Sequence, residues 1–142
     1  SFYWKLARPG DTELDVSQCP DLVPPLAAMA ALRTGEMTHI VGAARLRIKE
    51  SDRLATITAQ LNALGADIEE LPDALTIHGV DSLNGGTVSG CNDHRIAMMA
   101  AIAASRATGD VVIHGAEAVN KSYPDFFDHY RLLGGKVTLE EE

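Results

Sequence analysis

The feature that most constrains the fold of this 142-residue chain is an internal repeat whose period is about half the chain length. The segment VSQCPDLVPPLAAMAALRTG, beginning at Val16, aligns with VSGCNDHRIAMMAAIAASRATG, beginning at Val88. Shorter matches follow in the same order: THIVG with VVIHG, IKESD with NKSYPD, and ALGADIEEL with LLGGKVTLE. Two copies of one supersecondary unit predict two similar halves that stack and share a core.

Each copy alternates strand-like and helix-like segments, which predicts an α/β fold with helices buried against sheets. The predicted unit is β-α-β-α-β-β, and it occupies approximately residues 12–85 and 86–142 of a single domain. Residues 1–11, with the motif FYWKL, are read as a leading hairpin strand. The other predicted strands are Thr38–Val41, Asp67–Leu71, Ala74–His78, Thr87–Ser89, Val111–His114 and Lys136–Leu139, and the predicted second helices of the copies are Asp52–Leu64 and Pro124–Leu133.

Composition bounds the class of protein. Apolar residues make up 46% of the chain and charged residues 23%, which are values typical of globular domains. The formal net charge of −8 argues against a nucleic-acid partner, and no apolar run is long enough to span a membrane. Two cysteines without a CxxC motif favour a reduced, cytoplasmic protein. Because the sequence starts at Ser1 without Met, we expect a piece of a longer protein.

Positive charge is concentrated in one short segment of this acidic chain. The ten residues Arg45–Leu54 hold four of the twelve Lys and Arg residues, and Arg45, Arg47 and Lys49 alternate. In an extended backbone, alternate side chains point to the same side. Lys49 and Arg53 flank the predicted start of a helix, where free N–H groups favour phosphate or carboxylate. The segment therefore predicts a focused site for a small anion.

Three other predicted helix starts also carry polar and charged residues. If the two copies pack in parallel, the four starts converge at one rim and form a shared anion site. Each residue also has a purely structural explanation: Asp21 and Asp93 as N-caps, Glu50 and Arg53 as an i,i+3 pair, Arg95 as a solvated helix residue. The four starts carry Asp21; Lys49, Glu50 and Arg53; Asp93, His94 and Arg95; and Lys121 with Asp125.

The remaining candidates point to structure rather than chemistry. His94 either titrates near neutral pH or orients a neighbour, and the other histidines lack the spacing of metal ligands. Cys19 and Cys91 are interpreted as small packed residues, with a catalytic thiol as the lesser alternative. Helical spacing places Phe126, Phe127, Tyr130 and Leu133 in the core. No P-loop, GxGxxG or GxSxG motif is present.

Four segments together resemble the C-terminal part of 5-enolpyruvylshikimate-3-phosphate synthases: CPDLVPPLAAMAAL, RLRIKESDRL, NDHRIAMMAAIAA and NKSYPDFF. The resemblance implies a two-domain enzyme of the inside-out α/β barrel type, with three βαβαββ units per domain and an active site between the domains. This chain would be part of the C-terminal domain, with the N-terminal domain as its partner. The implied reaction transfers the enolpyruvyl group of phosphoenolpyruvate to the 5-hydroxyl of shikimate 3-phosphate, a step toward aromatic amino acids, without metal or organic cofactor.

The same resemblance implies a role for each site residue. Asp21 would act as the base and, with Lys49, contact shikimate 3-phosphate. Lys49 and Glu50 would also take part in catalysis, Lys49 near the proton-transfer chemistry and Glu50 as a proton-transfer group. Arg53, Arg95 and Lys121 would bind phosphoenolpyruvate, and His94 would support Arg95. Because the N-terminal domain would supply further cations and serines, we expect this chain alone to fold without turning over.

Two alternatives stay open from the sequence. The related transferase acting on UDP-N-acetylglucosamine shares the fold and usually carries a cysteine general acid on a loop, and neither Cys19 nor Cys91 is expected in such a loop. A non-catalytic anion-binding or assembly domain is the second alternative, against which Asp21, Glu50 and Lys121 argue.

Overall fold

A computed structural model describes residues 2–140. Residue 1, the first of the predicted leading segment, and residues 141 and 142, the last of the predicted second repeat, lie outside the described residues. After helix α1 (Phe2–Ala7), the first repeat forms β1 (Thr12–Asp15), the 3₁₀ helix η1 (Pro20–Leu22), α2 (Val23–Ala30), β2 (Met37–Val41), η2 (Ala44–Ile48), α3 (Arg53–Ala63), β3 (Asp67–Glu70) and β4 (Leu75–His78). The second repeat forms β5 (Gly86–Ser89), α4 (His94–Ala104), β6 (Val111–His114), the 3₁₀ helix η3 (Ala116–Lys121) and α5 (Phe126–Leu132).

Strand pairing shows the repeat directly. β1 and β2 pair in parallel, and their counterparts β5 and β6 do the same, each pair being joined by a crossover helix. The first sheet has the order β1-β2-β4-β3, in which β4 is antiparallel to both neighbours. The predicted α/β class is therefore confirmed, and both repeats begin with the same βαβ unit.

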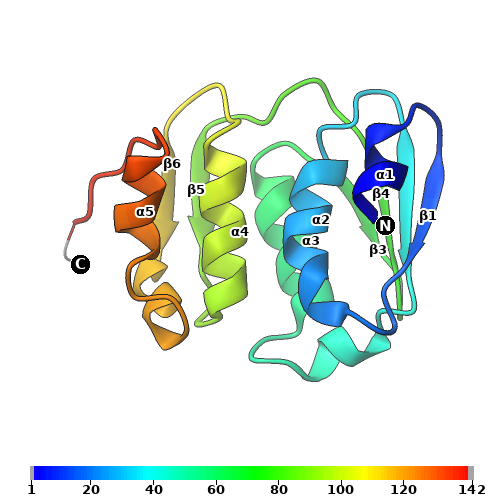
Figure 1. Ribbon diagram of the computed structural model, residues 1–142, viewed down its shortest axis with the longest axis horizontal. Coiled ribbons are helices and arrows are strands. Elements are labelled where there is room, and N and C mark those ends of the chain that lie inside the picture. Colours follow the sequence, from blue (N-terminus) through cyan, green and yellow to red (C-terminus); the bar gives the residue numbers. More distant parts are fainter. Residues whose placement is uncertain (1, 141–142) are drawn as a thin grey trace.

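Three of the helices lie together. α2, α3 and α4 contact one another and lie in the middle of the molecule in Figure 1, with β1, β3 and β4 to the right and β5 and β6 to the left. Their apolar faces join one core that draws on both repeats, with Leu14, Ile40, Leu54, Ile57 and Ile96 all fully buried. The expected shared core is present. A smaller cluster around Phe127 joins α4, η3 and α5.

The leading segment is a helix, so the predicted strand in residues 1–11 was wrong. Phe2 and Leu6 are four residues apart, the spacing of one helical face, and Leu6 is buried in the core. The end of this segment is held by Arg33, which donates hydrogen bonds to the carbonyl oxygens of Leu6, Arg8 and Gly10. Tertiary contacts from the turn after α2 therefore stabilise a turn of helix that its short sequence does not specify.

The predicted strand Lys136–Leu139 does not form. In the first repeat the equivalent strand, β3, pairs with β4 and not with β2. Within residues 2–140 no strand corresponding to β4 lies beside β6, so Lys136–Leu139 has no partner to pair with. Leu133, which was predicted to be in the core, is 90% exposed at the end of α5, so that prediction was wrong.

Candidate active site

Three of the four predicted helix starts meet at one end of the molecule. Side chains from η1, from the start of α3 and from the start of α4 contact one another there, although they are 32 to 74 residues apart in sequence. Asp52 caps α3 by accepting the N–H of Ala55, and Asp93 caps α4 by accepting the N–H of Arg95. These caps fix the directions in which Arg53 and Arg95 leave their helices.

Asp21 is the point on which the cations converge. It lies within η1, where the N-caps of η1 and α2 are Cys19 and Leu22, so it is not an N-cap. Its Oδ1 lies 3.0 Å from Nη1 of Arg53 and 3.8 Å from Nζ of Lys49, and its Oδ2 lies 3.8 Å from Nη2 of Arg95. Since its side chain is 49% exposed, this carboxylate faces the rim and is open to a ligand.

Arg53 and Asp93 form a buried ion pair that the sequence did not reveal. Their side chains are 1% and 0% exposed, and Nε and Nη2 of Arg53 donate to the two carboxylate oxygens of Asp93 at 2.9 and 3.2 Å. Ser51 Oγ donates to Oδ2 of Asp93 at 2.8 Å. Asp93 is thus the expected cap and, in addition, the group that holds Arg53 against α4.

The buried pair keeps both of its members charged. Burial alone would raise the pKa of Asp93, but the hydrogen bonds from Arg53 and Ser51 and the charge of Arg53 outweigh it and hold that pKa below its ordinary value. Burial likewise opposes the charge of Arg53, yet the hydrogen bonds and charge of Asp93 raise the pKa of Arg53. The pair therefore remains ionised in the interior.

The outer edge of Arg53 is occupied by carboxylates. Nη2 of Arg53 pairs with Glu50, which is the i,i+3 contact the sequence allowed, and Nη1 pairs with Asp21. Glu50 is 45% exposed and Arg53 almost fully covered. An anion reaches the guanidinium of Arg53 only by taking the place of one of these carboxylates.

Lys121 lies beside this cluster, at a position in its repeat equivalent to that of Lys49. Lys121 is the last residue of η3, and Lys49 directly follows η2. The ammonium of Lys121 donates to both the main-chain oxygen and Oδ1 of Asn92, the residue before Asp93. His94 follows Asp93, and its Nδ1 is buried without a hydrogen-bond partner among the described residues.

The extended backbone expected for the cation-rich segment was wrong. Arg45 and Arg47 lie in η2 rather than in an extended backbone, so their side chains diverge. Arg45 makes a long contact of 3.4 Å with the carbonyl of Ser17, while Arg47 pairs with Asp52 and Glu70. Of this segment, Lys49, Glu50 and Arg53 face Asp21 and its neighbours.

Both cysteines lie in the turns that lead from a strand to a helix start. Cys19 and Cys91 are half-buried, and Cys91 packs against the core, as expected for small packed residues. Cys91 Sγ lies 3.6 Å from the carbonyl of Ser89, a partner within its own turn.

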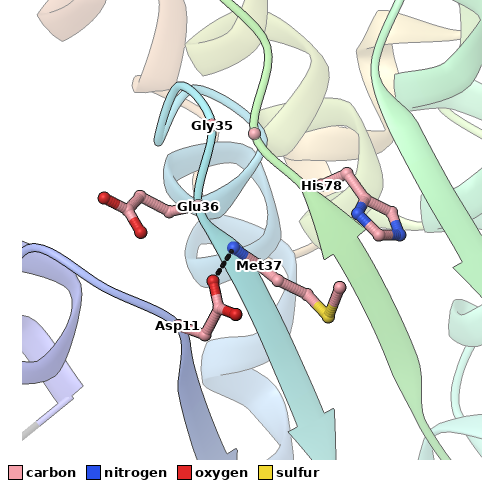
Figure 2. A pocket seen from close by; sticks show the side chains of 6 residues that line it. Asp11, Gly35, Glu36, Met37 and His78 are labelled. Atoms are coloured by element: carbon pink, nitrogen blue, oxygen red, sulfur yellow. Dashed lines mark hydrogen bonds between the residues drawn. The ribbon is translucent and has the colours of Figure 1, made fainter.

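A separate cavity of about 220 Å³ lies at the other end of α2. Asp11, Gly35, Glu36, Met37, His78 and Gly79 line it, and Figure 2 shows Asp11 accepting the main-chain N–H of Met37. None of the predicted site residues is among them. Among the described residues there is no group of His, Cys, Asp and Glu arranged to hold a metal, and no helix long and apolar enough to cross a membrane.

Comparisons with known proteins agree with the geometry. A family model described as EPSP synthase (3-phosphoshikimate 1-carboxyvinyltransferase) matches residues 8–130. The 3-phosphoshikimate 1-carboxyvinyltransferase of Clostridium kluyveri is 56% identical over 87% of this chain, and that of Clostridium acetobutylicum is 53% identical over 96% of it. The chain spans 29% and 32% of the lengths of these two curated relatives. An EPSP synthase structure from Acinetobacter baumannii superposes with a TM-score of 0.82 at 34% identity, covering 89% of this chain and 30% of that one. This chain belongs to the EPSP synthase family.

Proposed function

We propose that the full-length protein carrying this chain transfers the enolpyruvyl group of phosphoenolpyruvate to the 5-hydroxyl of shikimate 3-phosphate, with release of phosphate. The relatives that match this chain are named 3-phosphoshikimate 1-carboxyvinyltransferases. The observation that carries the proposal is the convergence of Lys49, Arg53 and Arg95 on the half-exposed carboxylate of Asp21. Both proposed substrates are anions, so a cluster of cations around an acid–base group suits them.

The chemistry assigns distinct tasks to these groups. Attack of the 5-hydroxyl on the enol carbon requires a base for the hydroxyl proton and an acid for the methylene carbon. Asp21 is proposed as the base and Glu50 as a proton-transfer group. Lys49 is proposed to orient shikimate 3-phosphate, since its ammonium lies 3.8 Å from Asp21.

Arg53, Arg95 and Lys121 are proposed to bind phosphoenolpyruvate. A guanidinium presents a planar set of donors that matches carboxylate and phosphate. We infer that the substrate anion takes the place of Asp21 or Glu50 on the outer edge of Arg53, which frees that carboxylate for proton transfer. The buried Asp93 would keep Arg53 in place during this exchange, and His94 would support Arg95 from behind.

The charge count at this rim supports a second wall contributed by other parts of the protein. Lys49, Arg53, Arg95 and Lys121 are nearly balanced by Asp21, Glu50 and Asp93, so little positive charge is left for two anionic substrates. We propose that an N-terminal domain of a cytoplasmic two-domain enzyme supplies further cations and closes the site. The isolated 142-residue chain is then expected to show no turnover.

The test is phosphate release by the purified full-length protein. With shikimate 3-phosphate and phosphoenolpyruvate together, we expect steady-state phosphate release that requires both substrates. Replacing shikimate 3-phosphate by UDP-N-acetylglucosamine is the control for the related transferase. The proposal is overturned if phosphate is released with phosphoenolpyruvate and the UDP-sugar but not with phosphoenolpyruvate and shikimate 3-phosphate. It is also overturned if no phosphate is released with shikimate 3-phosphate.

A further inference from the structure

The turn between β5 and α4 has an unusual backbone. Cys91 and Asn92 both have φ of 54°, and within residues 2–140 they are the only non-glycine residues with positive φ. Asparagine tolerates this left-handed region better than most residues, whereas for Cys91 it carries a steric cost. A conformation of this kind persists only where the surrounding structure holds it.

The turn sends two neighbouring residues to two different cations. Asp93 points inward and pairs with Arg53, while the exposed Asn92 turns both of its oxygens to Lys121. The main-chain oxygen of Asn92 lies 2.6 Å from Nζ of Lys121, and Oδ1 lies 2.7 Å from the same atom. In a left-handed residue both oxygens can face one ammonium, and here they do.

These contacts restrict a side chain that is otherwise free to move. Lys121 is exposed, and a lysine stem has four rotatable bonds whose freedom must be given up to hold the ammonium in one place. Its repeat counterpart Lys49 is instead placed near a carboxylate, that of Asp21. The acceptors on Lys121 are neutral amide oxygens, so they orient the ammonium without cancelling its charge.

We propose that Asn92 is a positioning residue for Lys121: its two neutral oxygens hold the ammonium at the rim while leaving the positive charge for the phosphate of phosphoenolpyruvate. The inference rests on the proposed function, because it concerns how one group of that site is placed. It adds to the site a residue that acts through Lys121, the group it contacts.

Three substitutions in the full-length protein separate the contributions of Asn92. Asn92→Gly keeps the left-handed backbone and the main-chain oxygen but removes Oδ1. Asn92→Asp keeps both oxygens and adds a negative charge beside the ammonium. Cys91→Gly is the matched control, because it changes the neighbouring left-handed residue without removing an oxygen from Lys121.

Steady-state kinetics give the first readout. We expect Asn92→Gly to raise KM for phosphoenolpyruvate about fivefold, equivalent to ~1 kcal/mol, with KM for shikimate 3-phosphate unchanged. Asn92→Asp should raise KM for phosphoenolpyruvate at least as much, because its charge competes with the phosphate. Cys91→Gly should leave both constants unchanged. Equal KM values in wild type and both Asn92 variants would overturn the inference.

Lysine reactivity gives a readout that does not depend on turnover. The rate at which acetic anhydride modifies Lys121, measured by mass spectrometry against the exposed Lys136 of the same chain, should rise in Asn92→Gly and stay constant in Cys91→Gly. An unchanged ratio in Asn92→Gly counts against the inference even if the protein is active. If wild type lacks turnover but the ratio rises as expected, the proposed function fails while the contact of Asn92 with Lys121 stands.

Discussion

Replacing Asp93 by Asn tests the buried ion pair that organises the site. Asparagine caps helices about as well as aspartate, so the cap on α4 is kept while the charge opposite Arg53 is removed. Breaking one side of a buried ion pair costs about 3–5 kcal/mol. Arg53 retains Asp21 and Glu50, and the Asn oxygen still accepts one hydrogen bond, so we expect a loss of about 2–3 kcal/mol.

The assay is native-state hydrogen exchange of the full-length protein, read on peptides that cover α3 and α4. A loss of about 2–3 kcal/mol corresponds to exchange about 30- to 150-fold faster for amides protected by opening of these helices. Hydrogen exchange resolves this region from the rest of a multidomain protein, where a single unfolding free energy is poorly defined.

Asp52→Asn is the matched control, because Asp52 is the N-cap of α3 and also pairs with an arginine, Arg47. That pair is partly exposed, at 42% for Asp52 and 29% for Arg47, so the same substitution should cost only about 0.5–1 kcal/mol. If Asp93→Asn costs no more than Asp52→Asn, Asp93 is a cap and nothing else, and the reasoning about Arg53 is refuted.

Two further predictions concern protonation and catalysis. Because the folded-state pKa of Asp93 lies below its ordinary value of 3.8, the stabilisation from the pair is complete above that pH and is lost as pH falls through the folded pKa. The stability difference between wild type and Asp93→Asn, followed by hydrogen exchange of α3 and α4 from pH 7 to pH 3, should therefore shrink only below about pH 4. A difference that is constant with pH would contradict it. Asp21→Asn should lower kcat at least about 100-fold while KM for either substrate rises little, since a general base acts in the transition state. If kcat is unchanged, Asp21 is not the base.

Much of the fold was predictable because its signals are local or repeated. The repeat predicted two equivalent βαβ units, and the parallel pairs β1–β2 and β5–β6 confirm it. The apolar spacing from Leu54 to Leu64 predicted α3 to within one residue at each end. The leading helix and the unpaired segment Lys136–Leu139 were mispredicted, because both depend on what packs beside them.

The sequence predicted which residues belong to the candidate site, but not which of them pair with one another. Convergence of the helix starts was expected if the two repeats packed in parallel, and side chains from η1, α3 and α4 do meet. The pairing of Arg53 with Asp93 joins residues 40 positions apart, and nothing in either local sequence signals it. The prediction for Arg45 and Arg47 failed because alternating cations were read as one face of an extended strand. The backbone there forms the 3₁₀ helix η2, in which alternate side chains do not share a side. The sequence match of Lys49 with Lys121 predicted their positions better than the charge pattern did, since Lys49 directly follows η2 and Lys121 ends η3.

The central claim is that the converged helix starts form one site for two anionic substrates. Its most direct test is a titration of the isotope-labelled full-length protein with shikimate 3-phosphate and then phosphoenolpyruvate, followed by NMR. We expect the largest shifts at residues 17–22, 49–53, 91–95 and 119–122. Shifts concentrated elsewhere, for example around Asp11 and His78 in the cavity of Figure 2, would contradict the claim.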